Sequence, residues 1–197
     1  MSRVLLLSGG LDSTSVAAWQ RPEHCLVIDY GQRAAAAERR AAAAVATDLD
    51  LPYTHITVNA SAVSGGLMAN QPHSVGETPE WWPYRNQFLI TVAAGWAVLR
   101  AYDEILVGTV AGDGDRHADG TQTFYDAMTA VLQSQEGRLS VSAPAIHLAA
   151  PALIHESNVT DSTLGWTHSC HVDNLPCGRC PGCVKRAEVL ARAERLQ

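Results

Sequence analysis

Lysine and charged residues in general are scarce in this sequence. Lys185 is the only lysine among 197 residues, and all charged residues together make up 17% of the chain. The formal net charge is -6, so we do not expect broad binding to nucleic acid or to an anionic membrane surface. Any catalytic lysine has only one possible position.

Long apolar runs are also missing, and we expect no secretory leader. No apolar stretch reaches the length of a membrane span, and the first residues lack the basic region that opens a signal peptide. Hydrophobic residues nevertheless make up 47% of the chain, which is enough to bury a core in one domain. We therefore expect a cytoplasmic protein with no membrane partner, folded as a single domain over residues 1–197.

Strand and helix patterns alternate along most of the chain. Strand patterns run into Ser8 and cover residues 26–30, 51–58 and 104–108. Helix patterns end near Gln20 and cover residues 34–48, 86–101, 121–135 and 185–196. This alternation predicts an α/β fold, with a parallel sheet that carries helices on both faces.

The first strand leads directly into Ser8-Gly9-Gly10-Leu11-Asp12-Ser13 and then into a helix. The two glycines have no Cβ, so their amides can close around an anion, while the new helix points its unpaired amides at the same place. No Gly-Lys-Ser/Thr of a P-loop follows, and no Gly-x-Gly-x-x-Gly is present. The pattern predicts a phosphate cradle with Asp12 placed to hold Mg²⁺, although a plain strand-to-helix connection is the alternative.

Four of the five cysteines gather near the end of the chain, within a loop spanning residues 170–183. Their spacing, with Gly178 and Gly182 between them, predicts a closed structural Zn²⁺ site, whose ligands are Cys170, Cys177, Cys180 and Cys183. Disulfides are a poorer interpretation in a reducing cytoplasm, and an iron-sulfur cluster is the remaining alternative. The fifth cysteine, Cys25, is expected to be a buried core thiol.

The loop from Ser8 to Ser13 resembles the SGGxDS loop of the N-type ATP pyrophosphatases, and three further motifs narrow the resemblance. These are Asp29-Tyr30-Gly31-Gln32, Pro83-Tyr84-Arg85-Asn86 and the cysteine cluster. Together they resemble the QueC family of 7-cyano-7-deazaguanine synthases. The resemblance implies an adenine-nucleotide alpha-hydrolase-like, Rossmann-like fold, bound zinc, a homodimer, and an ATP-dependent carbon-nitrogen ligase of queuosine biosynthesis. That ligase would convert 7-carboxy-7-deazaguanine to its nitrile with ammonia.

The same resemblance assigns site residues position by position. It implies catalytic roles for Asp12, Ser13, Arg85, Asp113 and Asp119. It implies ATP-binding roles for a larger set that shares the carboxyl end of the sheet, namely Ser8, Gly9, Gly10, Leu11, Asp12, Ser13, Asp29, Tyr30, Gly31, Gln32, Arg85, Asn86 and Gly108. Tyr84 stands where the family has a glycine.

Two departures from the family pattern concern the steps that follow activation of the substrate carboxylate by ATP. Ala111 stands where the family has Glu, and Ala149-Ala150 stand where it has Lys. Arg116 is the nearby cation that could replace that lysine. We expect activation of the substrate to be retained and nitrile formation from ammonia to be weakened.

Two other functions remain open from the sequence. One is a QueC-like enzyme of an antiphage or DNA-modification gene cluster, which would transfer an activated deazaguanine to a protein or nucleic-acid amine. The other is a non-catalytic nucleotide sensor. Asp12 argues against a sensor, because a binding fold has little need of a Mg²⁺ carboxylate.

Residues 61–83 are rich in Gly, Pro, Ser and Asn, which is typical of a loop that covers a site. Trp81 and Trp82 lie near its end. They are predicted either to stack on a deazapurine or to pack against the core.

Overall fold

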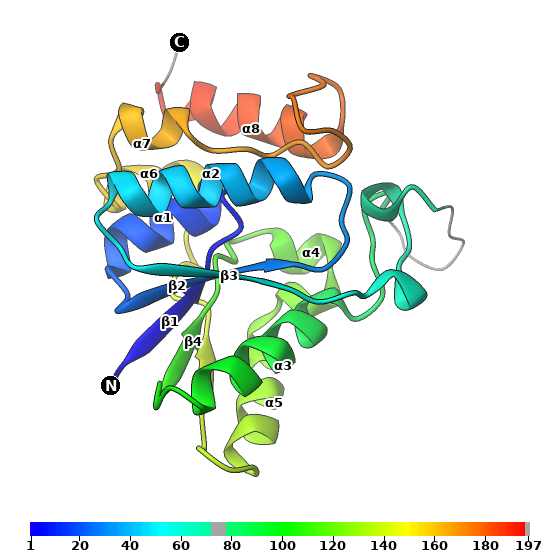
Figure 1. The fold of residues 1–197 in the computed structure, drawn as a ribbon. Coiled ribbons are helices and arrows are strands. Elements are labelled where there is room, and N and C mark those ends of the chain that lie inside the picture. Colours follow the sequence, from blue (N-terminus) through cyan, green and yellow to red (C-terminus); the bar gives the residue numbers. More distant parts are fainter. Residues whose placement is uncertain (72–77, 196–197) are drawn as a thin grey trace.

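A five-stranded parallel sheet forms the centre of the computed structural model, which describes residues 1–71 and 78–195 (Figure 1). The strand order is β3-β2-β1-β4-β5. The strands are β1 (Arg3–Leu6), β2 (His24–Asp29), β3 (Tyr53–Thr57), β4 (Glu104–Leu106) and β5 (Ser140–Ser142). Parallel pairing runs throughout, with Val4 opposite both His24 and Ile105. The predicted α/β class with a parallel sheet is confirmed.

Helices cover both faces of the sheet, as predicted (Figure 1). On one face lie α1 (Leu11–Gln20), α2 (Ala35–Asp48), α6 (Ala150–Glu156), α7 (Asp161–Gly165) and α8 (Pro181–Arg192). On the other face lie α3 (Arg85–Val98) and α5 (Gln122–Gln133). The short helix α4 (Asp113–Arg116) and the 3-10 turn η3 (Ala118–Gly120) follow β4.

The strands bury residues toward both faces, which gives the molecule two cores. Leu5 and Val27 belong to the core under α1 and α8, whereas Val4, Leu26 and Ile105 belong to the core under α3 and α5. Successive residues of a strand point to opposite faces, so strands buried on both sides have continuous apolar sequences. Cys25 is fully buried in the first core, as expected for a core thiol.

Local sequence explains where several helices begin. The Thr121 hydroxyl accepts a hydrogen bond from the Phe124 amide and caps α5, and Thr160 caps α7 through the Thr163 amide. α8 begins with Pro181 directly after Cys180, whose sulfur accepts from the Cys183 amide. These caps satisfy amides that would otherwise lack partners at the start of each helix.

The structure adds elements that the sequence patterns did not predict. β5 extends the sheet, and α6 and α7 occupy the region around and after Pro151, where the helix and strand patterns weaken. These elements have seven residues or fewer, which is too short for hydrophobic periodicity to stand out. α8 starts four residues earlier than predicted, at Pro181 instead of 185, because the proline and Cys180 form its first turn.

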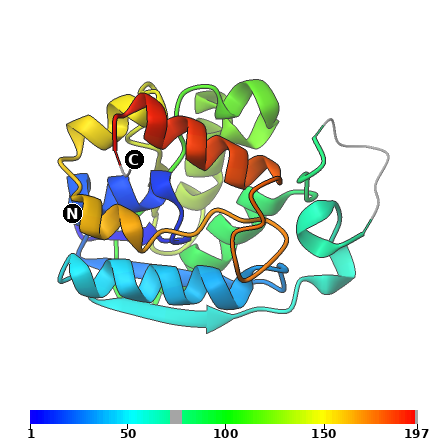
Figure 2. The same ribbon diagram turned by 90° about the horizontal axis from the view of Figure 1, so that it is seen from above.

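The 61–83 segment is mostly irregular, as predicted. It contains the 3-10 turns η1 (Ser61–Val63) and η2 (Leu67–Ala69) and an isolated bridge between Gly66 and Gln71. Residues 72–77, in the middle of this predicted lid, lie outside the described residues. Figure 2 shows residues 61–71 at one side of the molecule, beyond the helices.

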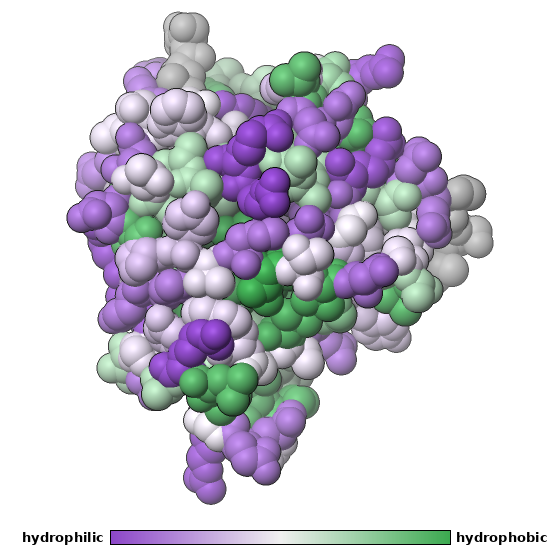
Figure 3. Space-filling model, in the orientation of Figure 1, coloured by the Kyte–Doolittle hydropathy of each residue, from purple (hydrophilic) through white to green (hydrophobic). Residues whose placement is uncertain are grey.

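The outer surface is mixed in character. Figure 3 shows hydrophilic residues over most of one face, with hydrophobic residues gathered near its middle. Within residues 1–71 and 78–195, no helix is both long enough and apolar enough to cross a bilayer.

The carboxyl ends of all the strands lie at one edge of the sheet, because the strands are parallel. β1 lies between β2 and β4, and the strand order reverses between β1 and β4. The loops after these two strands diverge toward opposite faces, which leaves a crevice at this point. The Ser8 to Ser13 loop follows β1, so the fold places it beside this crevice.

Gly108, which follows β4, lies in close contact with the start of α1. A Cβ at Gly108 would lie 2.7 Å from the Ser13 backbone nitrogen, whereas a Cβ at Gly95, exposed in α3, would meet nothing within 4 Å. We expect Gly108→Ala to destabilise the protein by about 1–3 kcal/mol through overpacking. Gly95→Ala should stabilise it by up to about 1 kcal/mol through helix propensity. Urea denaturation measures both, and equal stabilities for the two variants would contradict the packing described for β4 and α1.

Candidate active site and metal centre

The loop after β1 has the geometry of an anion cradle. The Ser8 and Ser13 hydroxyl oxygens lie 3.0 Å apart, and the Gly10 amide donates to the Ser8 hydroxyl at 3.4 Å. α1 begins at Leu11, so the unpaired amides of its first turn face the loop. Gly9 has a φ of +78°, and a Cβ there would lie 2.7 Å from the backbone of α2. Only glycine fits this position, so the loop lies tightly between β1 and α2.

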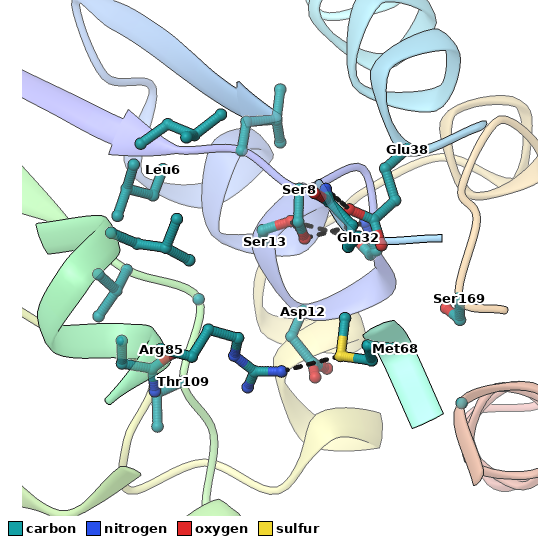
Figure 4. Close-up of a pocket in the computed structure, with 18 of the residues that line it drawn as sticks. Leu6, Ser8, Asp12, Ser13, Gln32, Glu38, Met68, Arg85, Thr109 and Ser169 are labelled. Carbon is teal, nitrogen blue, oxygen red and sulfur yellow. Dashed lines mark hydrogen bonds between the residues drawn. The ribbon is translucent and has the colours of Figure 1, made fainter. Parts of the chain in front are cut away.

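The cradle opens into a cavity of about 360 Å³ (Figure 4). Its wall comes from the carboxyl ends of β1, β2 and β4 and from the starts of α1, α3 and α8. Twelve of the residues predicted for the site line it, namely Ser8, Gly10, Leu11, Asp12, Ser13, Asp29, Tyr30, Gln32, Arg85, Asn86, Gly108 and Asp113. Gly9, Gly31 and Asp119 do not line it. Figure 4 shows Asp12 and Arg85 approaching the same open space from different elements.

The turn after β2 is held by its own side chains. The Asp29 carboxylate accepts from the Gly31 amide at 3.0 Å, and the Gln32 side-chain oxygen accepts from the Tyr30 amide at 2.9 Å. Gly31 has a φ of +98°, which glycine adopts without strain. These bonds fix the Asp-Tyr-Gly-Gln stretch against the cavity wall.

Glu38 is a cavity residue that sequence analysis missed. Its carboxylate accepts from the Gln32 side-chain amide at 2.7 Å. Burial raises the pKa of Glu38, an effect that the Gln32 hydrogen bond and the charge of Arg85 oppose. The surrounding sequence is an alanine-rich helix with charges on its solvent side, so no local signal distinguishes Glu38 from an exposed helix residue.

Arg85 and Asn86 start α3 on the opposite wall. The Arg85 guanidinium donates to the Met68 sulfur at 3.2 Å (Figure 4). The Asp119 carboxylate accepts from the Asn86 backbone amide at 3.2 Å, and the Asn86 side chain donates to the Asp119 carbonyl at 3.0 Å. Asp119 therefore holds the first turn of α3, while Arg85 remains part of the cavity wall.

Lys185 is the second cavity residue that sequence analysis left out of the site. Its ammonium nitrogen lies 3.1 Å from Asp12 Oδ2 and 3.1 Å from Asp113 Oδ1. Burial raises the pKa of Asp12; the charge of Lys185 acts against this, and that of Asp113 adds to it. Two carboxylate oxygens thus converge on a position that a cation occupies. This donor set suits Mg²⁺, which prefers oxygen ligands.

Arg116, the cation expected to substitute for a missing lysine, has another partner. Its guanidinium is hydrogen-bonded to the buried Glu80 carboxylate, and His117 Nε2 lies 3.7 Å from the same Glu80 oxygen. Burial alone would raise the pKa of Glu80, but the bond from His117 and the charge of Arg116 contribute to lowering it to about 2. The ion pair fastens the end of the 61–83 segment to α4.

Trp82, at the end of the same segment, is a core residue. It is 4% exposed and packs edge-on against Tyr30, with ring centroids 5.0 Å apart. Of the two predicted roles for Trp82, the structure supports packing against the core.

The four clustered cysteines converge at the start of α8. Their sulfur atoms all lie within 4.8 Å of one another, with Cys177 and Cys183 4.0 Å apart and Cys170 and Cys180 3.9 Å apart. These separations are about twice a disulfide bond length, so the thiols are free. Four thiolates around a tetrahedral Zn²⁺ at about 2.3 Å are separated by about 3.8 Å. The cluster therefore fits zinc.

Backbone amides donate to the Cys177 and Cys180 sulfurs and favour the thiolate form there, whereas burial raises the pKa of the Cys183 thiol. The Cys180 amide donates to the Cys177 sulfur, and the His171 and Cys183 amides donate to the Cys180 sulfur, each at 3.4 Å. Hydrogen bonds from the Arg179 and Cys180 amides lower the pKa of the Cys177 thiol to about 6. The four cysteine sulfurs supply all the ligands that a tetrahedral structural zinc site needs.

Comparison with known proteins shows which family this chain resembles. Residues 2–194 match the model of the family described as "Queuosine biosynthesis protein QueC". A 7-cyano-7-deazaguanine synthase of Solidesulfovibrio magneticus is 33% identical, over 93% of this chain and 88% of the relative. A synthase of the same name from Pseudomonas fluorescens is 32% identical, over 96% of this chain and 91% of the relative. "7-cyano-7-deazaguanine synthase 1" of Desulfitobacterium hafniense is 29% identical, over 98% and 92%.

The metal centre generates a prediction about composition and stability. We expect purified protein to carry about one zinc per chain, and Cys180→Ser to lose it together with thermal stability, because metal binding contributes folding free energy. Cys25→Ser, which changes a fully buried thiol away from the cluster, is the control and should keep its zinc. Elemental analysis and thermal denaturation measure both effects. Iron in place of zinc, or zinc retained by Cys180→Ser, would contradict the assignment.

Proposed function

The chain belongs to the QueC family, and from that premise we propose that it is an ATP-dependent ligase acting on 7-carboxy-7-deazaguanine. The proposed reaction adenylates the substrate carboxylate, joins it to ammonia and continues to the nitrile. The observation that carries the proposal is the Ser8–Ser13 cradle with Asp12 beside it, at the edge of the sheet where β1 and β4 diverge. The names of the relatives support the choice of substrate.

In the first step, a carboxylate oxygen of the substrate attacks the α-phosphorus of ATP. A new oxygen–phosphorus bond forms, and the bond from that phosphorus to the bridging oxygen breaks. Pyrophosphate leaves with the bonding electrons into the cradle, where the Ser8 and Ser13 hydroxyls and the first amides of α1 donate to it. Mg²⁺ held by Asp12 would neutralise part of the charge on the leaving group.

The second step consumes the adenylate. Ammonia attacks the activated carbonyl, AMP leaves with the original carboxylate oxygen, and an amide remains. A second ATP then adenylates the amide oxygen and releases a second pyrophosphate, and loss of AMP together with both N–H protons of the amide, which pass to water, gives the nitrile. These steps require positioning and electrostatic stabilisation and no covalent enzyme nucleophile.

Positioning in this proposal comes from the walls of the cavity. Arg85 faces the cradle across the cavity and is suited to bind a carboxylate or phosphate through two N–H groups. Asp119 acts on it indirectly by holding the first turn of α3. Asp29 and Gln32 shape the turn that borders the nucleotide, and Gly108 allows β4 to approach Ser13.

The proposal treats residues 1–197 as one catalytic domain, with the 170–183 loop as a zinc-binding part of it. The single sheet with a core on each face supports this. A homodimer is expected from the family resemblance, and its test is the molar mass in solution.

Asp12→Asn tests the role of the carboxylate beside the cradle. We expect it to reduce pyrophosphate release in the presence of 7-carboxy-7-deazaguanine by roughly 10²-fold or more, because an electrostatic group is removed from the reacting phosphates. The amide matches the carboxylate in size, so little change in folding is expected. Asp126→Asn, on the exposed side of α5, is the matched control and should keep normal turnover. Near-normal release by Asp12→Asn would contradict the assignment.

The nucleophile is tested by product analysis. The protein is incubated with 7-carboxy-7-deazaguanine, ATP, Mg²⁺ and excess ammonium, and the products are identified by mass spectrometry. We expect the substrate to be activated but the nitrile to form slowly, because Ala111 and Ala149-Ala150 stand where the family has Glu and Lys. Rapid and complete conversion to the nitrile would contradict this expectation. AMP and pyrophosphate without nitrile would favour transfer to a protein or nucleic-acid amine. Binding of ATP with no pyrophosphate release would favour the nucleotide sensor.

A further inference from the structure

Lys185 lies at the centre of a three-group contact inside the cavity. Its ammonium nitrogen is 3.1 Å from one oxygen of Asp12 and 3.1 Å from one oxygen of Asp113. The side chain of Lys185 is 39% exposed, and those of Asp12 and Asp113 are 23% and 29% exposed. All three line the cavity wall, so a ligand can reach them.

Contacts of the residues before and after Lys185 fix the position of its backbone. Cys180 caps α8 and Cys183 lies in its first turn, within the metal cluster. A Cβ at Gly182 would overlap the Ser169 carbonyl oxygen, so the first turn of α8 packs tightly against the loop that contains Ser169. After Lys185, the Arg186 guanidinium donates to the Thr167 hydroxyl. The ammonium therefore projects from a fixed point, as preorganised charge stabilisation requires.

The Lys185 ammonium group keeps a hydrogen-bond donor that an anionic ligand could use. A lysine ammonium has three N–H donors, and its contacts with Asp12 and Asp113 use two of them. Mg²⁺ accompanying ATP would compete with the ammonium for Asp12, because both cations need the same carboxylate. Released from Asp12, the ammonium still has Asp113 to hold it near the cradle and gains a donor for a phosphate oxygen.

We propose that Lys185 is a catalytic residue, whose ammonium group contacts a phosphate oxygen of ATP and stabilises the charge that develops as pyrophosphate leaves. The inference rests on the proposed function. As the oxygen–phosphorus bond to the substrate forms and the bond to the bridging oxygen breaks, the electron pair moves onto pyrophosphate. Lys185 keeps its proton throughout and offsets this charge beside Ser8 and Ser13.

The competing explanation is an ion pair that only attaches α8 to α1 and α4. Three full-length, metal-loaded variants distinguish the two roles. Lys185→Met removes the charge, Lys185→Arg retains it with a different shape, and Arg192→Met removes an exposed positive charge from the same helix. For each, zinc content and melting temperature are measured alongside kcat and KM for pyrophosphate release.

We expect Lys185→Met to keep its zinc and to lose roughly 10²-fold in kcat, with a much smaller change in KM for ATP, because the charge acts in the transition state. Lys185→Arg should recover part of kcat, and Arg192→Met should match the wild type. The proposal is overturned if kcat of Lys185→Met stays near the wild-type value. It is also overturned if the loss of kcat only follows the fraction of protein that is folded.

A second readout needs neither substrate nor turnover. Mn²⁺ alone, followed by electron paramagnetic resonance, reports cation binding at Asp12 and Asp113. Lys185→Met should bind Mn²⁺ more tightly than the wild type, because a competing and repelling positive charge is gone. Unchanged Mn²⁺ affinity would overturn the role given to Lys185. Absence of pyrophosphate release by the wild type would instead reject the proposed function, so the two failures are distinguishable.

Discussion

Parallel pairing of β1 between β2 and β4 is the constraint on which the candidate site depends. It brings the carboxyl ends of the three strands to one edge and places the reversal of strand order beside β1. The cradle loop, the turn after β2 and Gly108 meet there without any of them lying near another in the sequence. Gly9 and Gly108 then allow α2 and α1 to approach this edge closely, which no larger residue would permit.

The metal cluster extends this arrangement to the end of the chain. The four cysteines bring together a loop that has few core residues of its own. One of them, Cys180, caps the start of α8. The same helix carries Lys185 to Asp12, 173 positions away in the sequence. The cysteine cluster, which fits a structural metal, thus sets where the first turn of α8 lies and with it the position of Lys185 in the cavity.

Much of the fold and part of the site could be predicted from the sequence, because both produce local patterns. Apolar strands, the Ser8 to Ser13 loop and the cysteine spacing each occupy a few neighbouring residues. Lys185 and Glu80 have no such signal, because their partners come from distant parts of the chain, and Glu38 has none because its sequence neighbours are those of an ordinary alanine-rich helix. Arg116 is the replacement cation that the sequence suggests, but it pairs with Glu80, whereas Lys185 reaches the cavity through the tertiary fold. β5 and α6 are too short for periodicity to reveal.

Isotope transfer from a labelled substrate shows whether the cavity activates a carboxylate by adenylation. 7-Carboxy-7-deazaguanine labelled with ¹⁸O in its carboxylate is converted with ATP and ammonium, and the phosphorus-containing products are examined by mass spectrometry. If the carboxylate oxygen attacks the α-phosphorus, AMP carries ¹⁸O and pyrophosphate carries none. Label in inorganic phosphate, or unlabelled AMP after turnover, would contradict the account, because the carboxylate would then have been activated at another phosphorus or not at all.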